Sequence, residues 1–147
     1  MRRQDKYPTT PTFQYLNANP HNRITTDCVI RAIAVARSGA KTEKKAKNMW
    51  TLVLNDLVAL SQKTGFVYDD TKCYAKYLEQ VGFEKRPQPR FANGTKMTLR
   101  EFIAKHPKGT YVVNMPSHLT AVVDGKNYDI WDCSKSSRRV GNYWEKV

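Results

Sequence analysis

The sequence has few cysteines and lacks the cysteine spacings that bind metals. Among its 147 residues only Cys28, Cys73 and Cys133 carry thiols, with no Cys-x-x-Cys pair and no His/Cys cluster. An odd number of widely spaced cysteines argues against a disulfide framework, and the missing spacing argues against a structural zinc site. We therefore expect reduced thiols, a cytoplasmic location, and neither a metal nor an organic cofactor.

Long apolar runs are also absent. No stretch approaches the roughly 20 consecutive apolar residues that a membrane-spanning helix needs. The segment Met1 to Pro8 has no apolar stretch after its charges, unlike a secretory signal peptide. We expect neither a signal peptide nor a membrane anchor, and no membrane partner.

Acidic residues are scarce relative to basic ones. The chain has 25 lysines and arginines against 13 aspartates and glutamates, giving a formal net charge of +12. Such a surface attracts nucleic acids, anionic polymers or acidic proteins. However, no recognised nucleic-acid motif is present, and the basic residues are not interleaved with aromatics as a stacking platform requires. The basic residues group in three separate parts of the sequence: Lys41, Lys44, Lys45 and Lys47; Lys85, Arg86 and Arg90; Lys135, Arg138 and Arg139.

The length predicts a single domain, residues 1–147, of the α+β class. Residues 1–26, rich in Pro, Thr and Asn, are expected to form an extended arm that packs over the domain. Apolar spacing and end signals predict helices first and an antiparallel sheet afterwards. The expected helices are 28–36 with Gly39 as a stop, 42–65, 70–82 with Asp69 or Asp70 as the cap, and a short helix that starts at the capping box Thr98–Glu101. The expected strands are 110–115, 118–123, 128–133 and 140–144.

Cys28 stands where a helix is expected to begin. The acidic N-cap candidate Asp27 precedes an apolar helical run, so the thiol falls in the first turn. Unpaired N–H groups and the positive end of the helix dipole stabilise an anion there and lower a thiol pKa below its usual value of about 8.5. Cys28 is therefore a candidate nucleophile; the alternative is a small apolar residue of a buried helix.

A possible base lies in the predicted hairpin. His118 begins one strand, Asp124-Gly125 forms the turn, and Asp129 and Asp132 lie on the next strand. These two aspartates point to opposite faces of a regular strand, so only one can share a face with His118. A two-residue turn selects Asp129, and one additional loop residue selects Asp132. We prefer Asp132, which then lies level with the histidine, and keep Asp129 as the alternative.

The chain order of cysteine on a helix, then histidine and aspartate on a later sheet, resembles the papain-like cysteine peptidases. It looks most like the compact uncharacterised members found in bacteriophage and bacterial genomes. The resemblance covers 22–36 and 109–133. It implies a papain-like fold with a central nucleophile helix, Asp132 as the orienting acid, and the host cytoplasm as location if a phage encodes the protein. The glycine, serine and aromatic signature around the cysteine is absent, which argues against the cathepsin branch.

An oxyanion donor is less evident. The papain pattern places a glutamine several residues before the cysteine, whereas this chain has Asn22 six positions ahead of Cys28. An asparagine amide offers the same N–H chemistry on a shorter stem. Asn22 is the candidate donor, its alternative role being a turn former near Pro20; the backbone N–H of Cys28 can contribute in either case.

These observations predict a papain-like thiol hydrolase that cleaves a peptide or isopeptide bond through an acyl-enzyme on Cys28, with His118 as base. A transferase that uses the same acyl-enzyme is not separated from it by sequence. Two alternatives stay open: a basic nucleic-acid-binding protein, in which the charges carry the function and the apparent triad is structural or degenerate, and an inactive papain-like module for protein interaction. The expected partner is a protein or peptide substrate, with nucleic acid or an acidic protein as partners of the basic surface.

Overall fold

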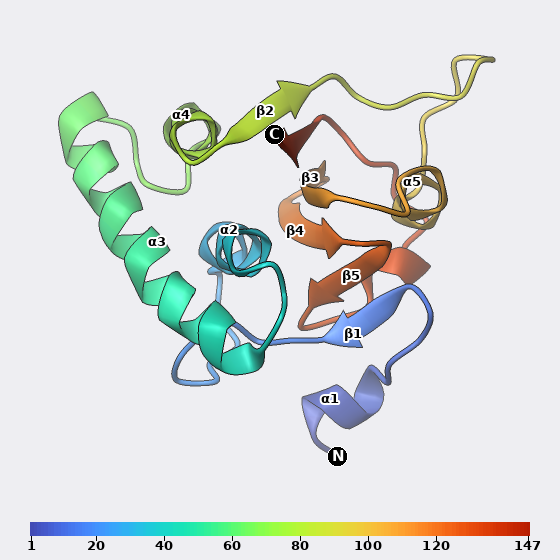
Figure 1. Ribbon diagram of the computed structural model, residues 1–147, viewed down its shortest axis with the longest axis horizontal. Helices are drawn as coiled ribbons and strands as arrows, with labels where there is room; N and C mark the ends of the chain where they lie inside the picture. Colours follow the sequence, from blue (N-terminus) through green and yellow to red (C-terminus); the bar gives the residue numbers. More distant parts are fainter.

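A six-stranded sheet forms the centre of the protein in the computed structural model, which describes residues 1–147 (Figure 1). Neighbouring strands are antiparallel, except that the first strand lies parallel to the fifth. The strands in spatial order are β1 (Phe13–Tyr15), β5 (Lys126–Asp129), β4 (His118–Val123), β3 (Thr110–Met115), β6 (Tyr143–Lys146) and β2 (Phe83–Arg86). The predicted α+β class is confirmed.

Helices cover the two faces of this sheet unequally. Alternate residues of β3 enter different core clusters. Val112 packs with the cluster of α2 (Cys28–Ser38), α3 (Glu43–Thr64) and α4 (Thr71–Gln80), and Val113 packs with the cluster of α5 (Leu99–Lys105). On the larger side α2 (Cys28–Ser38) lies against β4, and α3 (Glu43–Thr64) packs over α2 (Figure 1). The nucleophile candidate therefore begins the innermost helix.

The helix boundaries follow the local end signals. The Thr42 hydroxyl accepts a hydrogen bond from Lys45 at the start of α3. The Asp70 carboxylate caps α4 (Thr71–Gln80), and Thr98 forms the capping box that starts α5 (Leu99–Lys105). After α2, Gly39 adopts a φ of 73°, a conformation that glycine reaches without steric cost. The four predicted helices are confirmed.

The N-terminal arm and the end of the hairpin differ from expectation. Residues 1–26 contain the short helix α1 (Arg3–Lys6) and the strand β1, so the arm joins the sheet instead of only packing over it. The strand expected over 128–133 stops at Asp129, and a 3₁₀ turn, η1 (Cys133–Lys135), follows. The strand β2 was not predicted, because its four residues contain one apolar side chain, that of Phe83.

No helix of the structure combines the length and the apolar character needed to cross a membrane.

Candidate functional site

Cys28 is the first residue of α2, as predicted, but its neighbour Asp27 does not cap the helix with its side chain. The Asp27 carboxylate instead accepts hydrogen bonds from Arg31 Nε at 2.7 Å, Trp50 Nε1 at 2.9 Å and Asn19 Nδ2 at 3.1 Å. This buried carboxylate therefore anchors the start of α2 to the preceding loop and to α3. Asp27 therefore occupies the predicted N-cap position, but its side chain makes no cap hydrogen bond, because three nearby donors compete for its oxygens.

The thiol of Cys28 is half-buried and lies beside His118. Burial raises the pKa of Cys28, but several interactions act in the opposite direction. These come from the nearby His118 imidazole and backbone N–H of Leu119, which favour the thiolate as donors, and from the positive charges of His118 and Arg31. Their combined effect lowers the pKa of the thiol below its ordinary value, which favours the thiolate.

His118 is the first residue of β4 and links the thiol to a carboxylate. Its Nε2 lies 2.7 Å from Asp129 Oδ2, and its side chain keeps 12% of its solvent exposure. Burial lowers the pKa of His118, but the hydrogen bond to Asp129 and the interaction with Cys28 raise it to about 9. The indole of Trp131 covers part of the ring, with the centroids 5.2 Å apart. The imidazole is therefore held in one orientation and is stabilised as the cation.

The hairpin register explains why Asp129 is the partner of His118. The pairing of Val123 with Lys126 leaves only Asp124 and Gly125 in the turn, both with positive φ, as a tight two-residue hairpin turn requires. Continuing this register places Asp129 on the same face of the sheet as His118. Asp129, the alternative to Asp132, is therefore the aspartate that contacts His118.

Asp132, the preferred candidate, does not contact His118. It follows the end of β5 and starts η1, where its Oδ1 accepts a hydrogen bond from the backbone N–H of Ser134 at 3.0 Å. The preference for Asp132 is wrong because the turn has two residues and the strand ends at Asp129, so the chain has left the sheet before position 132. Asp132 is a capping residue in this structure.

Asp129 is buried and accepts hydrogen bonds on both oxygens. Oδ1 receives Arg31 Nη1 and the backbone N–H of Ile130, each at 2.7 Å, and Oδ2 receives the Thr120 hydroxyl at 2.6 Å in addition to His118. Burial raises the pKa of this carboxyl, but the hydrogen bond from His118 and the charge of Arg31 outweigh it and hold the pKa well below its usual range. The group is therefore an anion opposite the imidazole.

Arg31 is a residue of the site that was not predicted from the sequence. Its guanidinium, buried within α2, binds Asp27 through Nε and Asp129 through Nη1, each at 2.7 Å. It thereby joins the helix that carries the thiol to the strand that carries the carboxylate. The available signal was a lone cation in an otherwise apolar helical segment, since a buried charge requires partners.

Asn22 does not lie in this arrangement. It adopts a φ of 55°, is exposed, and accepts a hydrogen bond on Oδ1 from Lys47 Nζ of α3. No hydrogen bond connects it to Cys28, so the structure favours the turn-forming role over the oxyanion donor. The backbone N–H of Cys28, in the first turn of α2, has no partner within the helix and stays the candidate oxyanion donor.

The other two cysteines are buried and differ from Cys28. Cys133 Sγ lies 3.4 Å from Asp129 Oδ2, and burial together with the Asp129 charge raises the pKa of Cys133 well above its ordinary value. Burial likewise raises the pKa of Cys73. Ligand atoms of His118, Asp129 and Cys133 lie within 4.8 Å of one another, a spacing that a metal ion can use. Because Arg31 already binds Asp129 and the Cys133 thiol is held protonated, the arrangement favours an imidazolium over a metal as the cation there.

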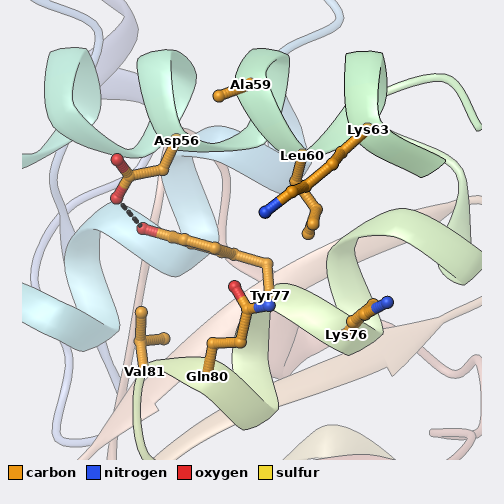
Figure 2. Close-up of a pocket in the computed structure, with 8 residues that line it drawn as sticks. All are labelled: Asp56, Ala59, Leu60, Lys63, Lys76, Tyr77, Gln80 and Val81. Carbon is orange, nitrogen blue, oxygen red and sulfur yellow. Dashed lines mark hydrogen bonds between the residues drawn. The ribbon is translucent and has the colours of Figure 1, made fainter. Parts of the chain in front are cut away.

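A concavity lies between α3 and α4, and it contains none of the residues of this site. Figure 2 shows the Tyr77 hydroxyl of α4 directed at Asp56 of α3, to which it donates a hydrogen bond at 2.8 Å. The same hydroxyl accepts from Arg37 of α2 at 2.7 Å. These contacts connect three helices, so we interpret this concavity as a helix junction. Its lining residues are Asp56, Ala59, Leu60, Lys63, Lys76, Tyr77, Gln80 and Val81.

The candidate active site is thus a thiol at a helix start, an imidazole beside it, and a buried carboxylate behind the imidazole. This combination pairs a nucleophile with a group that can hold and release a proton. The assignment depends on this geometry, since comparison of the chain with family models, with curated proteins and with solved structures finds no match.

Proposed function

We propose that the protein is a papain-like thiol hydrolase that cleaves a peptide or isopeptide bond through an acyl-enzyme on Cys28. The observation that carries the proposal is the contact of Cys28 with His118 and of His118 with Asp129, on a helix start and two adjacent strands. The packing of α2 against β4 supports a papain-like arrangement, because a helix supplies the nucleophile and an antiparallel hairpin supplies the base. Acyl transfer by a thiol uses a nucleophile, a base and an orienting acid in contact in this order, which supports the proposal.

The first half of the reaction forms the acyl-enzyme. The Cys28 thiolate attacks the scissile carbonyl carbon, and the backbone N–H of Cys28 donates to the resulting oxyanion. When the carbon–nitrogen bond breaks, His118 gives its proton to the leaving amine, which departs neutral. Asp129 keeps His118 Nε2 protonated, so the other ring nitrogen is the one that exchanges protons with the thiol and the substrate.

The second half releases the acyl group. His118, now neutral, removes a proton from water, and the oxygen of that water attacks the thioester carbonyl. The carbon–sulfur bond then breaks, the acid product departs, and the thiolate–imidazolium pair returns. If an amine replaces water, the same steps transfer the acyl group to that amine. Hydrolysis and acyl transfer therefore use the same residues and differ only in the acceptor.

The test is the pH dependence of Cys28 alkylation by iodoacetamide, followed by peptide mass mapping. Only the thiolate reacts, and the lowered pKa of Cys28 means that labelling persists below the usual thiol pKa of about 8.5. In His118→Ala the two contributions of the imidazole, its hydrogen bond and its positive charge, are lost, whereas burial, the Leu119 N–H and the Arg31 charge remain, so the pH profile moves upward. At about pH 7 we expect the variant to react at least tenfold more slowly, since one pKa unit is about a factor of ten.

Cys73 and Cys133 provide internal controls, because both are buried and their raised pKa values predict slow labelling at the same pH. The thermal unfolding temperature of His118→Ala shows whether a slow reaction reflects a damaged fold. If Cys28 of the folded protein reacts slowly and its rate does not depend on His118, the hydrolase hypothesis is wrong. The inactive papain-like module for protein interaction is then the better hypothesis.

A further inference from the structure

A basic cleft lies next to the turn that precedes His118. It has a volume of about 570 Å³ and is bounded by the β3–β4 turn, the end of the β2–α5 connection and the segment before β6. Only one of its lining residues is apolar. The residues that line the basic cleft are Gln88, Lys96, Asn114, Met115, Pro116, Ser117, Arg138, Arg139 and Gly141.

The charge of the basic cleft is of one sign. Lys96, Arg138 and Arg139 contribute three cations, and no acidic residue lines it. Arg139 forms an ion pair with Glu101 at 3.1 Å, whereas Lys96 and Arg138 have no carboxylate partner. Two cations that face the same open space without counter-charges raise the local potential and attract an anion. The guanidinium of Arg138 also has the planar donor arrangement that binds carboxylates.

The basic cleft adjoins the candidate active site through the backbone. Ser117, an exposed lining residue, directly precedes His118 in the chain, and Arg138 Nη1 donates to the carbonyl of Pro116 at 3.3 Å. Successive Cα atoms are about 3.8 Å apart, and an extended peptide advances about 3.3 Å per residue. A peptide that runs from Cys28 along His118 towards Ser117 therefore reaches the basic cleft.

We propose that the basic cleft is a substrate subsite that binds acidic side chains of a peptide close to the scissile bond. The inference rests on the proposed function, since it names the substrate class of the same site: peptides with aspartate or glutamate flanking the cleaved bond. An acidic peptide is favoured over a nucleic acid because the three cations gather in one confined cleft beside the acyl-transfer residues instead of following a stripe along the surface.

Binding is measured directly with the Cys28→Ala protein and a fluorescein-labelled peptide rich in Asp and Glu, by anisotropy. The same peptide with Asn and Gln serves as the uncharged comparison. We expect the acidic peptide to bind more tightly, Arg138→Gln to weaken this binding about threefold, and Arg138→Gln with Lys96→Gln to weaken it about tenfold. The double variant Lys44→Gln with Lys45→Gln removes the same charge from an exposed part of α3 and is the matched control.

Three results overturn the subsite. The first is equal affinity for the acidic and uncharged peptides, and the second is an equal loss of affinity in the α3 control. The third is a single-stranded oligonucleotide of equal charge that binds more tightly than the acidic peptide and whose binding is abolished by the cleft substitutions. The last result makes the basic cleft a nucleic-acid site.

Covalent labelling separates the subsite from the proposed function. A vinyl sulfone on an acidic peptide is expected to label Cys28 faster than one on the uncharged peptide, and the cleft variants are expected to reduce this ratio. If iodoacetamide labelling depends on His118 but the two vinyl sulfones react equally, the subsite is wrong and the hydrolase stands. If iodoacetamide labelling does not depend on His118 but the acidic peptide binds at the cleft, the hydrolase is wrong and the basic cleft stands as a peptide-binding site.

Discussion

Asp129 places a negative charge in the protein interior and surrounds it with donors. Transfer of an unpaired carboxylate into such an environment costs several kcal/mol, and the group would take up a proton instead. Here Arg31, Thr120, Ile130 and His118 all donate to its oxygens, so the charge persists. This charge also affects the ionisation of Cys28, because a fixed anion behind His118 stabilises the imidazolium that keeps the thiol ionised.

Asp129 and Asp132 are distinguished by paired substitutions. Asp129→Asn removes the anion behind His118, so the pKa of His118 falls, that of Cys28 rises, and iodoacetamide labelling at about pH 7 slows at least tenfold. Asp132→Asn keeps a side-chain oxygen that can cap η1, so it is expected to change stability little and to leave the labelling rate near that of the wild type. The reverse pattern, with slow labelling only in Asp132→Asn, would restore Asp132 as the orienting acid.

At the scale of elements, α2 is held to the sheet by one buried cation as well as by apolar packing. Arg31 binds Asp27 at the start of its own helix and Asp129 at the end of β5. Two carboxylates and one guanidinium leave a net negative charge, which the imidazolium of His118 balances. The relative position of thiol and imidazole therefore depends on the same contacts that orient the helix.

Removal of the Arg31 guanidinium is expected to destabilise the fold strongly. Arg31→Met leaves two buried carboxylates without their cation, which typically costs about 3–5 kcal/mol of unfolding free energy. Arg37→Met, in the last turn of the same helix, removes a partly exposed pair with Asp56 and the hydrogen bond to the Tyr77 hydroxyl, and is expected to cost about 1 kcal/mol. Urea unfolding of the two variants measures the difference. Equal losses would show that the buried network contributes no more than the surface pair.

Over the whole molecule, a net charge of +12 on 147 residues opposes the compact state. Salt shortens the distance over which these charges repel one another, from about 30 Å at 10 mM to about 8 Å at 0.15 M. The buried ion pairs around Asp129 are screened much less, so the repulsion between surface cations is the quantity that salt changes most.

Sodium chloride is therefore expected to stabilise the protein. Between about 10 mM and 0.15 M we expect the thermal unfolding temperature to rise by about 3 °C, equivalent to about 1 kcal/mol for a chain of this size. Differential scanning calorimetry measures the change, and the variant Lys44→Gln with Lys45→Gln is expected to show a smaller one. An unfolding temperature that falls with salt would mean that favourable surface ion pairs outweigh the repulsion.

Local signals predicted the elements whose boundaries depend on nearby residues. The capping box at Thr98 and the stop at Gly39 are confirmed, since each acts within one helical turn. The strands β1 and β2 were not predicted. β1 has three residues and becomes a strand only by pairing with β5. β2 has little alternation of apolar and polar side chains, and it pairs with β6 and is joined to it by the ion pair of Arg86 with Glu145. Such pairing partners are remote in the chain, so local propensity carries little information about them.

The sequence by itself determined the α+β class, the helix that starts at Cys28, and the hairpin that starts with His118. Only the tertiary structure decided which aspartate faces His118, because one residue of turn length moves every side chain of a strand to the opposite face. It also decided the role of Arg31, whose partner Asp129 lies 98 positions away. A buried charge shows in the sequence that a partner must exist, but folding alone brings that partner into contact.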